Sequence, residues 1–299
     1  MGRVMTSAGA AAARVLVFAA AFGAAAGFPI GSGARAETSA WAEAAHAKVR
    51  LVSAAPATGG ANRVQLGLEI QLDPGWKTYW RAPGEGGMPP RFDWSGSANL
   101  ADIEVAWPAP RRFDIGGLES VGYADHVILP LDALLASPGE PLAVRLSLQY
   151  AVCREICMLV EARLALDLPS LAQQTSDSLS NAEAIERFRA RLPRPGAELG
   201  WSVAAVSRKA LAEGAERREV IIIDVANAGS PFVDPALMIE SAGIRFGRAM
   251  TKPALVPGQA RFVAPMHVAG AAPGGDLVLT LFDGERAGIL TVRMEPSDR

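Results

Sequence analysis

Two cysteines, Cys153 and Cys157, are the residues of this 299-residue chain whose type and spacing best suit chemistry. They lie in the segment Tyr150–Met158 and are one residue further apart than the cysteines of a C-x-x-C redox motif. Such a pair can exchange electrons by forming and breaking a disulfide, can hold a structural disulfide, or can bind a soft metal ion as thiolates. These alternatives place different demands on the backbone.

A disulfide between the two cysteines requires the chain to turn. In one straight strand their Cα atoms would lie about 13 Å apart, at ~3.3 Å per residue. A disulfide needs a Cα separation below about 7 Å. The chain must therefore reverse across 154–156 and form a hairpin. Even-numbered residues are apolar on both flanks, so the cysteines share the opposite parity, and we expect both on the less apolar, accessible face.

Local features leave three alternatives open for the pair. A structural disulfide would close a ring of five residues and would stabilise little, because the entropic benefit grows with loop length. A copper(I) site would use both thiolates and the thioether of Met158, since soft sulfur ligands favour that ion. A redox-active pair would need no cofactor beyond its own two sulfurs.

Other kinds of site are excluded by residue type or spacing. Gly84-Glu85-Gly86-Gly87 lacks the Lys-Ser/Thr of a phosphate-binding loop. His46, His126 and His267 are far apart and form no ligand-spaced pair. The chain carries 29 Lys+Arg against 31 Asp+Glu, a formal charge of −2, which argues against a nucleic-acid-binding protein.

Strands must position the cysteines. Apolar residues alternate with others through Val64–Leu72, Val144–Val152 and Val160–Leu168, which is typical of strands with one buried face. Pro- and Gly-rich connections, such as 82–90, separate these segments. We therefore predict an all-β fold whose first domain, over residues 37–170, is an immunoglobulin-like β-sandwich.

A short helix is predicted after this domain. Ser180-Asn181-Ala182-Glu183 has the form of a capping box, and Ile185, Phe188 and Leu192 follow at helical spacing. Prolines at 193 and 195 end the pattern. We expect a helical linker over residues 171–198.

A second strand-rich region follows Trp201. Val220–Ile223 predicts a fully buried strand. Further strands are predicted within 244–246, 261–265, 277–282 and 289–294. These segments predict a second immunoglobulin-like β-sandwich over residues 199–299.

Residues 1–36 have the pattern of a secretory signal peptide. Arg3 and Arg14 precede the apolar stretch Val15–Ala26, and Ala34-Arg35-Ala36 resembles a cleavage site. The stretch is shorter than the ~20 apolar residues of a membrane span. Residues 1–36 contain three arginines and no acidic residue. The mature chain therefore has 26 basic and 31 acidic side chains, a net charge of −5. We expect export to an oxidising compartment, where an isolated cysteine pair is normally a disulfide.

Four ordered motifs carry a resemblance to a known family. They are Gly75-Trp76-Lys77-Thr78-Tyr79-Trp80, Trp107-Pro108-x-Pro110-x-x-Phe113, Gly122-Tyr123-x-Asp125-x-Val127-x-Leu129-Pro130 and Tyr150-x-x-Cys153-x-x-x-Cys157. Over about residues 46–168 the chain resembles the amino-terminal periplasmic domain of DsbD-type thiol:disulfide interchange proteins, in particular the variant in the copper-sensitivity suppressor ScsB.

The resemblance implies a periplasmic, protein-disulfide reductase-like electron relay and assigns roles to residues. Cys153 and Cys157 would be the redox pair, with Cys157 carrying the mixed disulfide. Phe113 matches the stretch in which a cap loop shields the pair, and Tyr123 lies just after it. Asp125 and Tyr150 are expected to support the site or its cap.

The chain departs from the family in two ways. Met158-Leu159 follows the second cysteine, where family members commonly have proline. The sequence also has no membrane domain or C-x-x-C domain. The resemblance therefore implies thioredoxin-like periplasmic partners and a separate membrane electron-transfer protein, with a role in copper tolerance or cytochrome c maturation. The alternative is a non-catalytic binding module, or a copper(I)-binding protein with a structural disulfide.

Overall fold

The computed structural model describes residues 37–54, 62–84, 87–115, 118–169, 175–213, 216–267 and 274–295. The predicted signal peptide, residues 1–36, lies outside the described residues. None of the helices within the described ranges combines the length and the hydropathy that a membrane crossing needs.

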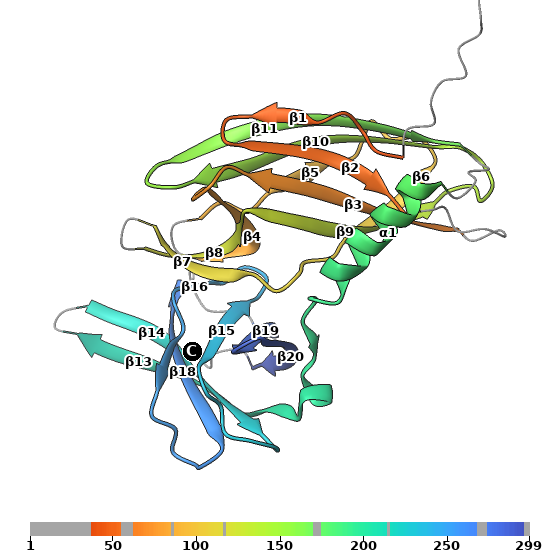
Figure 1. Cartoon of the computed structure of the whole chain (residues 1–299). Helices are drawn as coiled ribbons and strands as arrows, with labels where there is room; N and C mark the ends of the chain where they lie inside the picture. Colours follow the sequence, from red (N-terminus) through yellow and green to blue (C-terminus); the bar gives the residue numbers. More distant parts are fainter. Residues whose placement is uncertain are drawn as a thin grey trace, which may run out of the picture. The chain divides into compact units, whose positions relative to one another are not determined.

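Two antiparallel sheets form the first β-sandwich (Figure 1). One sheet has the strand order β1-β2-β3-β9-β6, and the other has the order β11-β10-β4-β8-β7 with β5 also paired to β10. The bounds are β1 Ala42–Ala44, β2 Ala47–Ser53, β3 Arg63–Leu72, β4 Lys77–Gly84, β5 Arg91–Asp93, β6 Leu100–Val105, β7 Arg111–Ile115, β8 Leu118–Ala124, β9 His126–Leu135, β10 Leu142–Cys153 and β11 Cys157–Leu168.

The second β-sandwich has sheets of order β12-β20-β19-β15 and β13-β14-β18-β16, with β17 also paired to β18. The bounds are β12 Arg194–Pro195, η1 (a 3-10 turn) Gly196–Leu199, β13 Trp201–Glu213, β14 Glu216–Asn227, β15 Pro235–Glu240, β16 Arg245–Phe246, β17 Met250–Lys252, β18 Gln259–His267, β19 Gly275–Asp283 and β20 Arg286–Met294. The predicted all-β fold with two immunoglobulin-like sandwiches is confirmed, whereas the boundaries at residues 170 and 199 stay predictions.

Each sandwich encloses its own hydrophobic core. The alternation of apolar residues explains the core of the first sandwich. The even-numbered residues of β10 and β11, such as Leu146, Leu148 and Leu166, are buried between the sheets. In the second core Ile221 and Ile223 are buried, but Ile222 between them is half-buried. The prediction of a fully buried strand at 220–223 was therefore wrong, because one face of β14 is turned away from the core.

The single helix of the described residues, α1 (Ser176–Arg189), joins the sandwiches in sequence. It begins earlier than predicted: Thr175 is the N-cap and forms a capping box with Ser178, so the box expected at Ser180 was wrong. Ile185 and Phe188 are buried in the core of the first sandwich. Figure 1 shows α1 lying across β9. The helix is therefore anchored to the first sandwich and is more than a linker.

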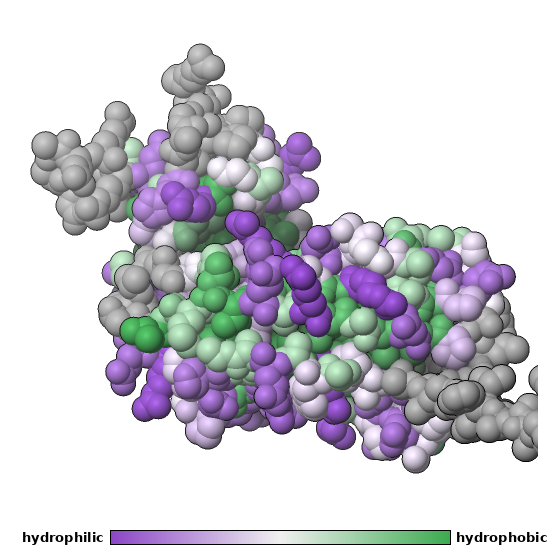
Figure 2. Space-filling model, turned by 90° about the horizontal axis from the view of Figure 1, so that it is seen from above, coloured by the Kyte–Doolittle hydropathy of each residue, from purple (hydrophilic) through white to green (hydrophobic). Residues whose placement is uncertain are grey.

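The surface is chemically mixed. Figure 2 shows hydrophobic patches between hydrophilic side chains on the face seen from above. Isolated exposed apolar residues are ordinary on soluble proteins. An exposed apolar side chain therefore indicates a site only where it adjoins reactive groups.

Candidate functional site

Cys153 and Cys157 form a disulfide at the tip of the β10–β11 hairpin. They are direct register partners, and their Cα atoms lie 4.1 Å apart. The turn between them is closed by the Arg154 backbone N–H, which donates to the carbonyl of Ile156 at 3.1 Å. The predicted reversal of the chain across 154–156 is confirmed.

The two sulfur-bearing residues differ sharply in exposure. Cys153 has a relative exposure of 1%, whereas Cys157 is exposed. The expectation that both would be accessible was therefore wrong for Cys153, because β4 and the residues around it cover this end of β10. Two large apolar side chains beside Cys157 are also open to solvent: Ile156 is 66% exposed and Leu159 is 63% exposed.

Tyr79 brings a phenol hydroxyl to the disulfide. Its oxygen lies 3.1 Å from Cys153 Sγ and 3.2 Å from Cys157 Sγ. A disulfide sulfur carries no proton, so the hydroxyl is the donor in both contacts. β4 positions this side chain, because Lys77 pairs with Cys153 and the Thr78 hydroxyl donates to the Ala151 carbonyl at 2.9 Å.

Tyr79 is buried, and its burial has an electrostatic consequence. Removal from water disfavours the phenolate and raises the pKa of Tyr79, while the Ser120 side chain beside it opposes this rise. The hydroxyl therefore stays protonated at neutral pH and remains able to donate to sulfur.

The chain after β4 returns over Tyr79. Tyr79, Ala151 and Cys153 form a small buried cluster, and Met88 packs against it. A Cβ atom added at Gly87 would lie 2.8 Å from Tyr79 Cδ1 and Cε1, which is closer than a side chain allows. Glycine at this position therefore lets the backbone lie directly on the phenol ring.

Met158 is not beside the sulfurs. It pairs with Val152 and packs against the core of the first sandwich. Successive side chains of a strand point to opposite faces, so the Met158 thioether and the Cys157 sulfur leave β11 on different sides. The structure does not bring together the predicted copper(I) ligand set of Cys153, Cys157 and Met158. Among the described residues, no group of three or more His, Cys, Asp and Glu could hold a metal ion.

The predicted cap residue Phe113 lies on β7, where it is half-buried and pairs with Ser120. Lys77 Nζ lies 5.3 Å from the centroid of its ring. Lys77 is the strand partner of Cys153. Its contact with Phe113 therefore places the phenyl ring near the disulfide.

The other predicted supporting residues have structural positions. Tyr123 is buried in the core and donates to the Pro108 carbonyl at 2.7 Å, and burial raises its pKa. Asp125 is exposed at the β8–β9 turn with a φ of 61°, and its carbonyl accepts from Leu72 N–H. Tyr150 is buried in the same core, on the opposite face of β10 from Cys153, and burial raises its pKa to about 12. None of these three is brought to the sulfurs by a contact among the described residues.

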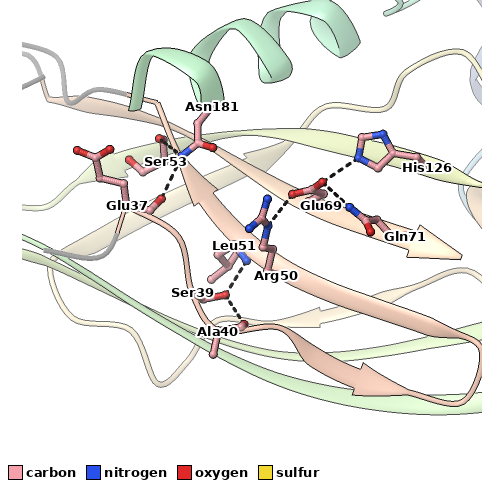
Figure 3. Close-up of polar contacts among 10 residues, drawn as sticks. All are labelled: Glu37, Ser39, Ala40, Arg50, Leu51, Ser53, Glu69, Gln71, His126 and Asn181. Atoms are coloured by element: carbon pink, nitrogen blue, oxygen red, sulfur yellow. Dashed lines mark hydrogen bonds and ion pairs between the residues drawn. The ribbon is translucent and has the colours of Figure 1, made fainter. Parts of the chain in front are cut away.

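A second polar cluster surrounds the buried carboxylate of Glu69 (Figure 3). Arg50 Nε donates to it at 2.7 Å, Gln71 Nε2 donates at 3.0 Å, and His126 Nε2 lies 3.0 Å away. Burial alone would raise the pKa of Glu69, but these hydrogen bonds and the charge of Arg50 outweigh it and lower the pKa to about 2. A carboxylate so fully paired serves as a structural link between β2, β3 and β9.

Sequence reasoning did not assign roles to Tyr79 and Met88. Tyr79 lies in the first motif, Gly75–Trp80. The motif therefore included this residue, but its spacing along the chain could not predict a contact with the sulfurs. Its contact with Cys153 joins residues 74 positions apart, which only the pairing of β4 with β10 brings together.

Comparisons with known proteins agree with this geometry. Residues 48–169 match the family profile described as "Thiol:disulfide interchange protein DsbD, N-terminal". The solved structure of the N-terminal periplasmic domain of ScsB from Proteus mirabilis is similar, with a TM-score of 0.67 and 22% sequence identity over 87% of this chain and 99% of that one. No curated protein matches the chain. The matched segment contains both cysteines, Tyr79 and Met88, and over residues 48–169 this chain is similar to DsbD-type N-terminal domains.

Proposed function

We propose that this chain is a periplasmic thiol:disulfide exchange protein that relays electrons through Cys153 and Cys157. The observation that carries the proposal is the asymmetric disulfide at the hairpin tip: Cys157 is exposed, and Cys153 is buried against Tyr79. Exchange proceeds by attack of a thiolate on one sulfur while the other sulfur leaves. An exposed Cys157 suits the attacked sulfur, and an adjacent Cys153 suits the one that later releases the partner.

A purely structural disulfide accounts less well for this arrangement. β10 and β11 are already joined over their whole length, from Leu142↔Leu168 to Cys153↔Cys157. A bond that closes such a short loop adds little to a hairpin that forms without it. An exposed sulfur gives a structural bridge no advantage, whereas exchange requires one.

The matched family profile and the leader pattern support the partners and the compartment that we propose. We propose export through residues 1–36 and function in the periplasm, as for the domain of ScsB to which this fold is similar. Thioredoxin-like proteins would exchange with Cys157, and a separate membrane protein would supply electrons. Copper tolerance or cytochrome c maturation is the process that we propose for it.

A redox titration tests the proposal. The purified chain is equilibrated in buffers of defined reduced and oxidised glutathione, quenched in acid and alkylated, and the alkylated fraction is measured by mass. An exchanging pair should become reduced within the range of thioredoxin-like proteins, about −270 to −120 mV. A chain that remains fully oxidised until below about −300 mV would instead contain a structural disulfide. The Cys153→Ser, Cys157→Ser double variant is the blank, because the chain has 2 cysteines in all.

A further inference from the structure

The contact between Tyr79 and both sulfurs has a direct bearing on bond breaking. When a partner thiolate attacks Cys157 Sγ, a new S–S bond forms and the Cys153–Cys157 bond breaks with its electron pair on Cys153 Sγ. Negative charge then develops on the sulfur of a residue that is 1% exposed. Burial disfavours a charged thiolate unless a donor is aimed at it.

The Tyr79 hydroxyl is such a donor. In the oxidised protein its oxygen lies 3.1 Å from Cys153 Sγ and 3.2 Å from Cys157 Sγ, so one proton faces two sulfurs that are nearly equidistant. After attack the sulfur of Cys157 is bonded to the partner and remains neutral, while that of Cys153 is charged. A hydrogen bond to an ionised acceptor is stronger than one to a neutral acceptor. The Tyr79 hydroxyl therefore donates its hydrogen bond to the Cys153 thiolate.

We propose that Tyr79 is a catalytic residue of exchange, donating the hydrogen bond that stabilises the leaving thiolate of Cys153. This inference rests on the proposed function. In the return step the Cys153 thiolate attacks Cys157 Sγ, the partner leaves with its electron pair as a thiolate, and Tyr79 again faces a disulfide. The tyrosine keeps its proton throughout, because a free thiol has a pKa of about 8.5 and a phenol about 10, and burial raises the phenol value further.

Three other charged groups lie near the hairpin tip. Lys77 Nζ lies 3.4 Å from the carbonyl of Gly75 and 5.3 Å from the Phe113 ring centroid. A Cβ atom at Gly75 would lie 3.7 Å from Arg154 Nε, so the Arg154 side chain lies against the turn before β4. Glu155 is exposed in the turn. These groups are present in the wild type and in a tyrosine variant alike, so a comparison of the two isolates the hydroxyl.

The chain offers a matched control. Tyr150 is also a buried tyrosine of the first sandwich, on the same strand as Cys153, but its side chain enters the main core. Its hydroxyl has no hydrogen-bond partner among the described residues. Tyr150→Phe therefore removes the same kind of atom, a phenol oxygen, from the strand of Cys153 without touching the sulfurs.

Two measurements test Tyr79→Phe. The first is the rate at which dithiothreitol reduces the disulfide of the full chain at fixed pH. We expect Tyr79→Phe to slow it by roughly tenfold, as for loss of one hydrogen bond to a developing charge, and Tyr150→Phe to leave it unchanged. The second is the pKa of the lone Cys153 thiol in a Cys157→Ser background, read from thiolate ultraviolet absorbance. Tyr79→Phe should raise this pKa.

Each outcome decides the matter. A slower reduction together with a raised Cys153 pKa supports the inference. An unchanged rate and pKa overturn it, and a faster reduction overturns it too, because Tyr79 would then only shield the sulfurs. Circular dichroism of both variants checks that the fold is kept. If the wild type itself resists reduction across the glutathione range, the proposed function fails; if the wild type exchanges and Tyr79→Phe matches it, only the role of Tyr79 fails.

Discussion

Cys153 and Cys157 are strand partners bonded to each other, yet Cys153 is buried and Cys157 is exposed to solvent. Exposure, set by β4 and Met88 on one side of the hairpin, therefore distinguishes two sulfurs that the sequence presents as equivalent. The difference gives a direction to exchange, since a partner must reach the sulfur that it attacks.

Single-cysteine variants should differ in their capture of a partner. We expect Cys153→Ser, which keeps the exposed thiol, to accumulate a mixed disulfide with a thioredoxin-like protein bearing one activated cysteine. Cys157→Ser keeps the buried thiol and should accumulate little. A non-reducing gel measures both, and equal capture by the two variants would contradict the asymmetry.

Apolar side chains beside Cys157 should contribute to partner binding. Ile156 and Leu159 are exposed and adjoin the sulfur that a partner must touch. Burial of one aliphatic side chain contributes about 1.5–3 kcal/mol, so Ile156→Asp or Leu159→Asp should slow mixed-disulfide formation with a thioredoxin-like protein by about tenfold or more. The rate with dithiothreitol should stay the same, because a small thiol needs no docking surface.

The control for this docking prediction lies in the second sandwich. Val233 is 87% exposed, so Val233→Asp adds the same charge to a position that is more open than Ile156 or Leu159. A similar loss in all three variants would indicate a general charge effect and would reject docking beside Cys157.

Gly122 should tolerate no side chain. A Cβ atom there would lie 1.9 Å from the Thr78 carbonyl oxygen and 3.0 Å from Tyr79 Cα, both in the backbone of β4. Because backbone atoms cannot move aside cheaply, we expect Gly122→Ala to lower the free energy of unfolding by about 3 kcal/mol, measured by urea denaturation. Gly229→Ala is the control, since its Cβ would meet nothing closer than Asn227 Oδ1 at 3.5 Å. Equal stability of the two variants would show that β8 and β4 do not approach so closely.

Glu69 should make the free energy of unfolding depend on pH. Its pKa falls from 4.5 to about 2 on folding, with the burial cost outweighed by His126, Arg50 and Gln71. A lowered folded-state pKa means that its contribution is fully present above about pH 4.5 and is lost as the pH falls toward about 2. The upper limit of this contribution is on the order of 3 kcal/mol.

Acid unfolding followed by fluorescence measures this contribution. Glu69→Gln should remove that part of the pH dependence, whereas Glu161→Gln, at an exposed position on β11, should retain it. Parallel curves for the wild type and Glu69→Gln below pH 4.5 would contradict the role given to the carboxylate.

The hairpin could be predicted because its evidence is local. Alternation through Val144–Val152 and Val160–Leu168 indicated two strands, and the reach of a disulfide required a turn between them. The same parity separated the cysteines from the core. The position of Met158 follows from this alternation as well, although its sulfur had suggested a ligand.

What could not be predicted depends on contacts between distant segments. Tyr79 meets Cys153 only because β4 lies beside β10, and Gly87 fits its ring only because the chain after β4 folds back. The start of α1 was missed for another reason: two capping sequences compete near residue 178, and burial of Ser178 with its Thr175 contact favours the earlier one. A prediction from local helix propensity takes no account of such burial.

The extent of the β10–β11 ladder affects how fast the cysteine pair can cycle between its oxidised and reduced forms. The ladder continues from the cystine to Leu142↔Leu168, so opening the S–S bond removes a link at one end and leaves the remaining pairs in place. The oxidised and reduced proteins should then share one backbone, and hydrogen-exchange protection along both strands should survive reduction. Two electrons could be gained or lost in each cycle with little reorganisation, so turnover would be governed by encounter with the partner and by sulfur chemistry, with no refolding step between cycles.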